Sequence, residues 1–336
     1  MQHEHGKVKK TDKRKAIILS VIVVIVMALC LGVLYLWENK HYDTGASGNG
    51  GGIEEPILKT VEYNGDTYQQ RDELETWLFM GVDVMGKVSN TDTFIDGGQA
   101  DMQLLITVDN KNQTWQMLQL NRDSMIEVPV LGMTGEEVGA EFEQLALAHS
   151  YGNGGKESCK NDVKAVSNMF DGQKINGYLA LNMEGLNILN DMVGGVPVVV
   201  NDDFTMLDPT LVQGQEVVLQ GSQALTFVRE RQNVGDETNV ARMARQREYM
   251  NSLKQKLKEQ DEEFGIRAYD ALSEYTVTNM GSGNITNLLQ CLKDYQERDL
   301  LTIDGESRIE NDTNAYYLNE DSLKQVMLEM FYEKVN

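Results

Sequence analysis

The sequence has few of the residues that most often carry metal and nucleophilic chemistry: three cysteines and four histidines among 336 residues. Cys30 lies in a long apolar run, so Cys159 and Cys291 remain as a possible pair, and three cysteines do not make a disulfide framework. The absence of a Cys-X-X-Cys or Cys/His cluster argues against a structural zinc site. We interpret His149 as a partly buried core residue, which leaves Ser-His-Asp and Cys-His mechanisms poorly supported.

Positive charge is also scarce over most of the chain. The net charge is −22, and residues 41–336 hold 23 lysines and arginines against 49 aspartates and glutamates. Five arginines nevertheless fall between residues 229 and 247. Because a guanidinium group offers a planar fork of donors, such a cluster favours a phosphate or carboxylate ligand. The alternative is a set of surface ion pairs on a helix, and the cluster alone leaves both interpretations open.

The first forty residues predict a membrane anchor. Residues 1–15 form a basic tail, and residues 16–36 form an uncharged apolar run that is long enough, as a helix, to cross a ~30 Å hydrocarbon core. A cleaved signal peptide is the alternative, but its apolar region is typically shorter and is followed by small residues. The positive-inside rule places the N-terminus in the cytoplasm and the main domain outside the cell. A nucleic-acid partner is not expected, because fifteen cytoplasmic residues are too few for a DNA-binding fold.

The remainder divides into three parts. Residues 37–71 contain a glycine-rich stretch and are predicted to be a flexible linker. Residues 72–258 are predicted to be the main domain, and residues 259–336 an extension that completes or caps it. Hydrophobic periodicity predicts strands at 77–83, 102–109 and 114–120, and helices at about 136–151, 158–170 and 239–258. Mixed strands and helices predict an α/β fold in which helices cover a sheet.

Two groups of residues are spaced to act together. Arg242, Arg245 and Gln246 lie at i, i+3 and i+4 on the long predicted helix and are therefore expected to share one face. Arg229 and Arg231 lie just upstream, and their i, i+2 spacing points them the same way if that segment is extended. The two rows facing one cleft would hold a diphosphate.

Carboxylates mark the ends of the first two predicted strands. Asp83 ends the first, and Asp101 begins the second after the Gly97-Gly98 turn. Mg²⁺ often takes one or two carboxylates together with phosphate oxygens, although aspartate is also frequent in turns for its own sake. Arg122 follows the third strand, and beside Asp123 it has the alternative of a surface pair that contributes little.

The order of these features along the chain is informative. The motifs are Gly81-Val82-Asp83, Ala100-Asp101-Met102, Leu120-Asn121-Arg122-Asp123-Ser124, Leu147-Ala148-His149-Ser150-Tyr151-Gly152, Val193-Gly194-Gly195-Val196-Pro197-Val198 and Gly221-Ser222-Gln223-Ala224-Leu225-Thr226-Phe227-Val228-Arg229-Glu230-Arg231, followed by Arg242 and Gln246. Together they resemble the LytR–CpsA–Psr (LCP) family of Gram-positive envelope proteins, over roughly residues 77–258 and the N-terminal anchor.

The resemblance implies a membrane-anchored phosphotransferase in cell wall biogenesis. It would move a glycopolymer, of the teichoic acid or capsular polysaccharide type, from a polyprenyl pyrophosphate carrier to peptidoglycan. The implied fold is an α/β/α sandwich with a central mixed sheet and an apolar pocket for the lipid, which we expect between Leu104 and Met192. The implied site has Asp83 and Asp101 as ligands of Mg²⁺. The pyrophosphate-binding set is Arg122, Arg229, Arg231, Arg242 and Gln246, and the catalytic set is Asp83, Asp101, Arg122, Arg229 and Arg231.

The chain departs from the family pattern at three positions. Gln99 stands where the family usually has Arg, Gln144 where Lys is common, and Asn239 where Asp is frequent. These changes keep two alternatives open. One is a non-catalytic envelope scaffold or sensor that binds polyprenyl phosphate or an anionic polymer, and the other is a polyprenyl-pyrophosphate pyrophosphatase. Phosphoryl transfer depends on charge neutralisation and positioning, and we hypothesise that Asp83 also accepts the proton of the acceptor hydroxyl.

Overall fold

The computed structural model of the chain describes residues 58–91, 97–310 and 313–335. They belong to one compact unit, Leu58–Asn336. Its strands are β1 (Thr60–Tyr63), β2 (Asp66–Gln70), β3 (Leu74–Val82), β4 (Ala100–Asp109), β5 (Thr114–Leu120), β6 (Met125–Leu131), β7 (Glu137–Gln144), β8 (Gly177–Asn182), β9 (Val196–Val199), β10 (Glu216–Leu219), β11 (Thr276–Thr278), β12 (Gln296–Glu297), β13 (Gly305–Glu310), β14 (Thr313–Leu318) and β15 (Tyr332–Val335). Its helices are α2 (Leu147–Ser150), α3 (Lys156–Met169), α4 (Met183–Met192), α5 (Ser222–Arg229), α6 (Asn239–Lys258), α7 (Phe264–Leu272) and α8 (Ser282–Asp294), a short 3₁₀ turn at Ser273–Tyr275, and α9 (Glu320–Phe331).

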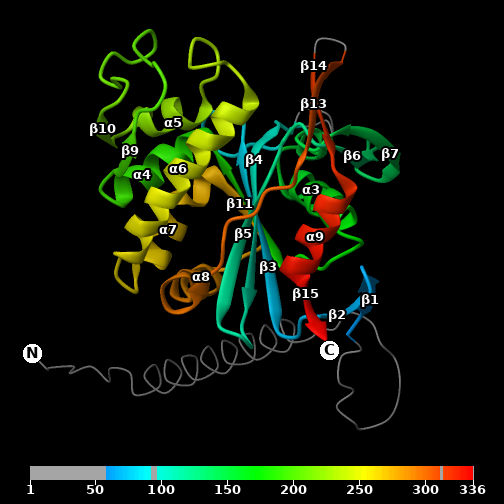
Figure 1. The fold of residues 1–336 in the computed structure, drawn as a ribbon. Helices are drawn as coiled ribbons and strands as arrows, with labels where there is room; N and C mark the ends of the chain where they lie inside the picture. The colour runs from blue at the N-terminus through cyan, green and yellow to red at the C-terminus, as the bar shows by residue number, and fades with distance from the viewer. Residues whose placement is uncertain (1–57, 92–96, 311–312, 336) are drawn as a thin grey trace, which may run out of the picture. The chain divides into compact units, whose positions relative to one another are not determined.

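A six-stranded mixed sheet organises the unit, in the order β11-β8-β3-β4-β5-β12. Strands β3, β4 and β5 run through the middle of the ribbon, with helices on both sides (Figure 1). Strands β3, β4 and β5 are mutually antiparallel, whereas β8 runs parallel to β3 and β12 runs parallel to β5. The expected α/β class with a central mixed sheet is therefore confirmed. The predicted strands at 77–83, 102–109 and 114–120 correspond to β3, β4 and β5.

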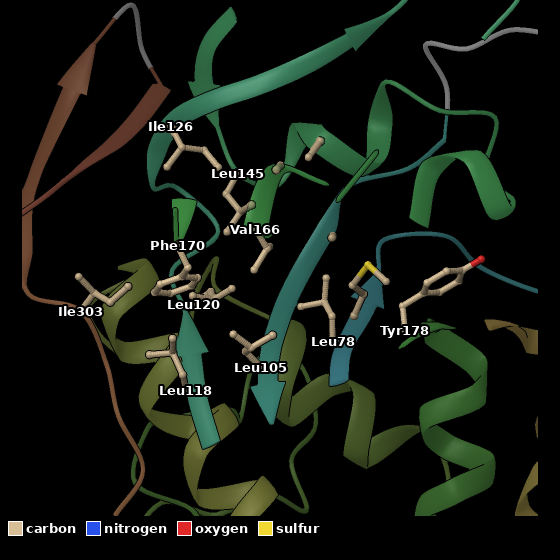
Figure 2. Packing of buried hydrophobic residues seen from close by; sticks show 14 of the residues in the cluster. Leu78, Leu105, Leu118, Leu120, Ile126, Leu145, Val166, Phe170, Tyr178 and Ile303 are labelled. Atoms are coloured by element: carbon tan, nitrogen blue, oxygen red, sulfur yellow. The ribbon is translucent and has the colours of Figure 1, made fainter. Parts of the chain in front are cut away.

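Both faces of this sheet are covered. Leu78, Leu105 and Leu118 are completely buried on one face, where they pack in one cluster with Val166 of α3 (Figure 2). The same cluster includes residues of α9. Leu104 and Ile106 point to the opposite face, together with Met250 of α6 and Leu288 of α8. Successive residues of a strand point to opposite faces, so a strand that is buried on both sides needs a continuous apolar run, which β4 supplies.

A third apolar cluster lies beyond the second face. It is built from α4, α5, α6, α7 and the β9–β10 ribbon, with Phe204 and Phe227 stacked at a centroid distance of 5.6 Å. Helix α6 takes part in both clusters, because Met250 packs toward the sheet while Tyr249 packs toward α4 and α5. This long helix, predicted at 239–258 and found at Asn239–Lys258, thus joins the sheet to the smaller cluster.

Two segments differ from the sequence-based expectation. Residues 60–70, within the range expected as linker, form β1 and β2, and β15 pairs with β2. The turn between them is Asn64-Gly65, both with positive φ, which is a common signature of a tight hairpin. The helix predicted at about 136–151 is wrong over most of its length: residues 137–144 form β7, because pairing with β6 overrides the helical propensity of its glutamates.

Candidate functional site

A cavity of about 810 Å³ lies between the sheet face that carries Leu104 and Ile106 and the helices opposite it. Its apolar walls come from β3, β4, β5, β8 and helices α4 to α8. The wall residues include Phe79, Met102, Leu104, Ile106, Trp115, Met117, Leu179, Leu181, Leu186, Leu189, Met250, Leu253, Leu257, Phe264, Leu272, Leu288 and Leu292. A space of this size and lining suits the apolar part of a ligand.

The polar lining of the cavity includes most of the residues that the sequence singled out. Asp83, Asp101, Arg229, Arg242 and Gln246 all line it. They come from the end of β3, the start of β4, the end of α5 and the first two turns of α6. Asp83 and Gln246, which are 163 positions apart in the chain, are thus brought to one rim.

Asp101 lies between two arginines. Its Oδ1 accepts a hydrogen bond from Nη1 of Arg122, and its Oδ2 lies 3.2 Å from Nη1 of Arg242. Arg122 also donates from Nη2 to Oε1 of Gln99 at 2.5 Å, and its Nε lies 3.3 Å from Oδ1 of Asp123. The Asp101 carboxylate therefore holds two guanidinium groups side by side in spite of their like charge.

Asn239 fixes the orientation of Arg242. Its Oδ1 accepts from Nε and Nη2 of Arg242 at 3.2 and 2.8 Å, and its Nδ2 donates to Oδ1 of Asn121 at 2.9 Å. Arg242 is only 6 % exposed, and burial lowers its pKa while the charge of Asp101 acts in the opposite direction. An amide at position 239 therefore orients Arg242 without neutralising it.

Gln144, the remaining departure from the family pattern, joins the rim to the C-terminal hairpin. Its Nε2 donates to Oδ1 of Asp123 at 3.1 Å and to the carbonyl oxygen of Asn314, the second residue of β14. Burial raises the pKa of Asp123, against the positive charges of Arg122, Arg242 and Arg231. Gln144 is thus linked to Asp101 through Asp123 and Arg122, and does not itself line the cavity.

Asp83 is the more open carboxylate of the rim. Its side chain is 43 % exposed, and its Oδ1 lies 4.0 Å from Nη2 of Arg229. Partial burial raises the pKa of Asp83, the negative charge of Asp101 raises it further, and Arg229 and Arg122 lower it. The charge of Asp101 thus disfavours the ionised form of Asp83, and a cation bound between the two carboxylates would relieve that repulsion.

Gln246 and Arg231 complete the predicted pyrophosphate-binding set. Gln246 donates from Nε2 to the carbonyl oxygen of Val228 at 3.3 Å and accepts from Gln119 at 3.3 Å. Arg231 is half-buried, and its charge acts on Arg242 and Asp123. Within the described ranges Arg231 forms no ion pair, so its guanidinium group stays available for a ligand.

Three arginines of the cluster, Arg231, Arg245 and Arg247, do not line the cavity. Arg245 is 3 % exposed and donates to the carbonyl oxygens of Phe227 and Glu230, with Nη1 2.5 Å from Oδ2 of Asp202. Its Nε bond to Phe227 is 3.1 Å long. Arg247 donates to Gln119 instead. Arg245 therefore fixes the backbone of residues 227–230, from which Arg229 projects, and is a positioning residue.

The rim can be tested for a metal ion. Among the residues described, no group of three or more histidines, cysteines or acids is arranged to hold one. Asp83 and Asp101 supply two carboxylates, which suits Mg²⁺ that takes its other ligands from phosphate oxygens and water. The rise in the pKa of Asp83 that the charge of Asp101 contributes to is the observation that makes this pair a fitting one.

Three further expectations concern residues away from the rim. His149 is buried, as interpreted from the sequence: its Nδ1 lies 3.0 Å from the carbonyl oxygen of Gly98, and burial lowers its pKa. Cys159 and Cys291 are both free thiols.

The part of the chain covered by the structure includes no helix that is both long and apolar enough to span a membrane, and the predicted span of residues 16–36 lies outside it.

The sequence-based expectation missed most of one cavity wall. It placed the lipid pocket between residues 104 and 192, yet α6, α7 and α8 contribute as much of the lining, with Leu253, Phe264 and Leu288 among them. The available signal was the apolar spacing at residues 250, 253 and 257 on the long helix. That spacing indicates a buried helix face but not what the face covers.

The fold and the rim define a class of protein: an α/β domain with an apolar cavity that ends in paired arginines and aspartates, suited to an amphiphile with an anionic head. The LytR_cpsA_psr family matches the chain over residues 46–331. The chain therefore belongs to this family.

The sequences of curated relatives agree with this family assignment. The chain is 26 % identical over 289 residues to the polyisoprenyl-teichoic acid–peptidoglycan teichoic acid transferase TagU of Bacillus mycoides, covering 81 % of this chain and 83 % of that protein. It is 25 % identical over 242 residues to TagU of Enterococcus faecalis, covering 71 % of each. It is also 31 % identical over 205 residues to biofilm regulatory protein A of Streptococcus mutans, covering 59 % of this chain and 45 % of that protein.

Solved structures support the fold. TagV of B. subtilis superimposes with a TM-score of 0.60 at 23 % identity, covering 76 % of this chain and 95 % of that one. TagT bound to LIIa-WTA superimposes with a TM-score of 0.59 at 20 % identity, covering 76 % and 89 %. The mixed six-stranded sheet described above is thus the sheet of a known fold.

Proposed function

We propose that this protein is a membrane-anchored transferase of the cell envelope. It moves a glycopolymer of the teichoic acid or capsular polysaccharide type from a polyprenyl pyrophosphate carrier to a hydroxyl group of peptidoglycan. The observation that carries the proposal is the continuity between the long apolar cavity and its rim of arginines and aspartates. An amphiphile with a lipid tail and a diphosphate head matches both parts of that surface.

The pyrophosphate is bound by the arginine rim. Arg242 and Arg122, already aligned by Asp101, bind one phosphate. Arg229 at the end of α5, Arg231 two residues beyond it and Gln246 on α6 bind the other. Hydrogen bonds between ionised groups are stronger than neutral ones, and fixed guanidinium groups need little reorganisation when charge develops on phosphate oxygens. Asp83 and Asp101 would hold Mg²⁺ together with phosphate oxygens, and the ion would neutralise negative charge there.

The transfer step forms one bond and breaks one. The acceptor hydroxyl oxygen attacks the phosphorus next to the glycopolymer, and the bond from that phosphorus to the bridging oxygen breaks. Polyprenyl phosphate leaves with the bonding electrons and is stabilised by the arginines. The hydroxyl proton passes to Asp83, whose half-exposed position and raised pKa suit a general base that must meet an incoming substrate.

The predicted membrane anchor would keep this site close to the lipid-linked donor. The anchor predicted at residues 16–36 and the linker that follows would keep the domain outside the cell and next to the bilayer that holds the lipid carrier. The departures at Gln99, Gln144 and Asn239 leave the arginines in place, because Gln99 and Asn239 contact Arg122 and Arg242 through neutral amides. A reduced charge at the rim is therefore compatible with a working site.

The test is a transfer assay with the full-length protein, a polyprenyl-pyrophosphate-linked oligosaccharide, peptidoglycan and Mg²⁺. Arg229→Ala and Asp101→Ala should abolish product. Lys324→Ala should not, because Lys324 pairs with Asp171 at the surface and does not line the cavity. Donor binding without transfer or phosphate release would replace the proposal with a scaffold or sensor. Phosphate release without transfer would replace it with a pyrophosphatase.

A further inference from the structure

The distance from the rim into the cavity can be estimated along two of its walls, the strand β4 and the helix α6. Asp101 at the rim and Ile106 deeper in both line it, and five residues of β4 span about 17 Å. Arg242 and Lys254 both line it as well, and twelve residues of α6 span about 18 Å. The strand and the helix therefore reach the same level, which lies near the end of the cavity opposite the arginines, since Leu257 is the one α6 residue farther on that still lines it.

Trp115 lies at that end. It lines the cavity, is 1 % exposed, and stands on β5 opposite Val108, two positions beyond Ile106 on the paired strand. On the other side of the sheet edge, Glu297 of β12 is the direct register partner of Trp115. The indole ring thus lies between the apolar space and the last strand of the sheet.

The Trp115 ring is contacted by the charged groups of two lysines. The Nζ atoms of Lys254 and Lys258 lie 5.7 and 5.5 Å from the centroid of the Trp115 ring, within the range of a cation–π contact. Glu297 forms ion pairs with both lysines, and Lys258 Nζ lies 3.3 Å from its Oε2. The Lys254 side chain is 11 % exposed and that of Glu297 is 32 % exposed, so the cluster separates the cavity from solvent.

We propose that Trp115, backed by Lys254, Lys258 and Glu297, is the end wall of the cavity and sets the length of lipid tail that the cavity can bury. The proposal rests on the proposed function, because it takes the occupant to be a polyprenyl chain. Each methylene buried in the cavity raises affinity about fourfold. A tail that reaches past Trp115 would have to separate paired charges or lie in water, so further length adds no affinity.

The experiment measures binding of polyprenyl monophosphates that share one head group and differ in the number of isoprene units. The full-length protein is kept in detergent, and bound lipid is quantified by native mass spectrometry. For the unchanged protein, affinity should rise with tail length and then level off. Trp115→Leu and Lys254→Ala should each move that plateau to longer tails. They should bind the longest tail on the order of tenfold more tightly, about two extra methylenes, with short-tail affinity unchanged.

Trp77→Leu is the matched control. Trp77 is 7 % exposed and belongs to the same apolar cluster as Trp115, but it does not line the cavity. Its substitution should leave the plateau where it is. If Trp115→Leu does not fold, Lys254→Ala decides the outcome, because its side chain ends at the protein surface.

The possible failures are distinguishable. Binding that levels off in the unchanged protein but keeps the same plateau in Trp115→Leu and Lys254→Ala would overturn the end wall and leave the proposed function intact. Affinity that continues to rise through the longest tail in the unchanged protein would overturn it as well. If no tail length binds, the cavity is not a lipid site, and the proposed function and this inference fail together.

Discussion

Arg242 on α6 and Asp101 on β4 are joined by an ion pair of 3.2 Å, across 141 positions of the chain. Because Arg122 binds the other oxygen of the same carboxylate, Asp101 is the point at which the sheet, the loop after β5 and the long helix meet. The side chains of Arg242 and Asp101 are only 7 % and 19 % exposed. The pair therefore organises the rim before any ligand arrives.

Asp101→Asn should lower the free energy of unfolding. An added anion should restore part of the lost stability. The substitution leaves Arg122 and Arg242 close together without their shared negative charge, which we expect to cost about 1.5–3 kcal/mol in the free energy of unfolding. Inorganic pyrophosphate should restore part of it by replacing that charge. Urea denaturation with and without pyrophosphate measures both effects, and an equal response of the unchanged protein to pyrophosphate would contradict the explanation.

Arg245 and Arg247 offer a matched pair, two positions apart on one helix. Arg245→Met removes a buried charge bonded to Asp202 and two carbonyl groups, and leaves Asp202 unpaired, so it should cost about 3 kcal/mol or more. Arg247→Met removes one hydrogen bond to Gln119 and should cost about 1 kcal/mol. Chemical denaturation compares them. Similar losses in the two variants would mean that Arg245 does not position residues 227–230.

Asp83→Asn should slow transfer about a hundredfold or more while donor binding is retained, since a positioned general base contributes ~10²–10⁴-fold. Partial burial and the charge of Asp101 raise the pKa of Asp83, and only the ionised form accepts a proton. Activity of the unchanged protein should therefore rise with pH as this carboxyl ionises, and Asp83→Asn should remove that rise. A variant that binds metal and donor and transfers at the unchanged rate would exclude Asp83 as the base.

The buried Asp162 on α3 gives a prediction about pH and stability. Burial raises its pKa well above the model-compound value of 3.8, against a smaller opposing effect of Gln103. The folded state therefore keeps a proton that the unfolded chain releases, so this group costs stability as pH rises above about 4, up to its folded pKa. Asp162→Asn should be increasingly more stable than the unchanged protein over that window. The exposed Asp270→Asn is the control, and a difference that does not grow with pH would contradict the prediction.

Much of the rim could be predicted from the sequence because its residues sit at ends of regular elements. Asp83 and Asp101 follow from strand ends and glycine turns, and Arg242 with Gln246 follows from helical spacing; the structure brings all four to one cavity. Their roles in binding and catalysis stay predictions. Arg245 shows the limit of spacing arguments: it is three residues from Arg242, yet its side chain turns to Asp202.

The parts that could not be predicted depend on long-range pairing. β7 has a glutamate-rich sequence, and only its register with β6 makes it a strand. The cavity wall from α7 and α8 depends on how residues 259–294 dock, which no local pattern specifies. The Asn64-Gly65 turn of β1 and β2, by contrast, is a local signal that was present in the sequence and predicts a hairpin.

The central claim is transfer of a phosphoryl-linked glycan to a sugar hydroxyl, and the most direct measurement is the fate of solvent oxygen. The full-length protein, a polyprenyl-pyrophosphate-linked oligosaccharide, peptidoglycan and Mg²⁺ are incubated in ¹⁸O-labelled water, and the products are examined by mass spectrometry. The account predicts a new phosphodiester on peptidoglycan and polyprenyl phosphate, neither of which carries label, because the attacking oxygen comes from the acceptor. Labelled phosphate without a phosphodiester product would contradict it, since water would then be the acceptor.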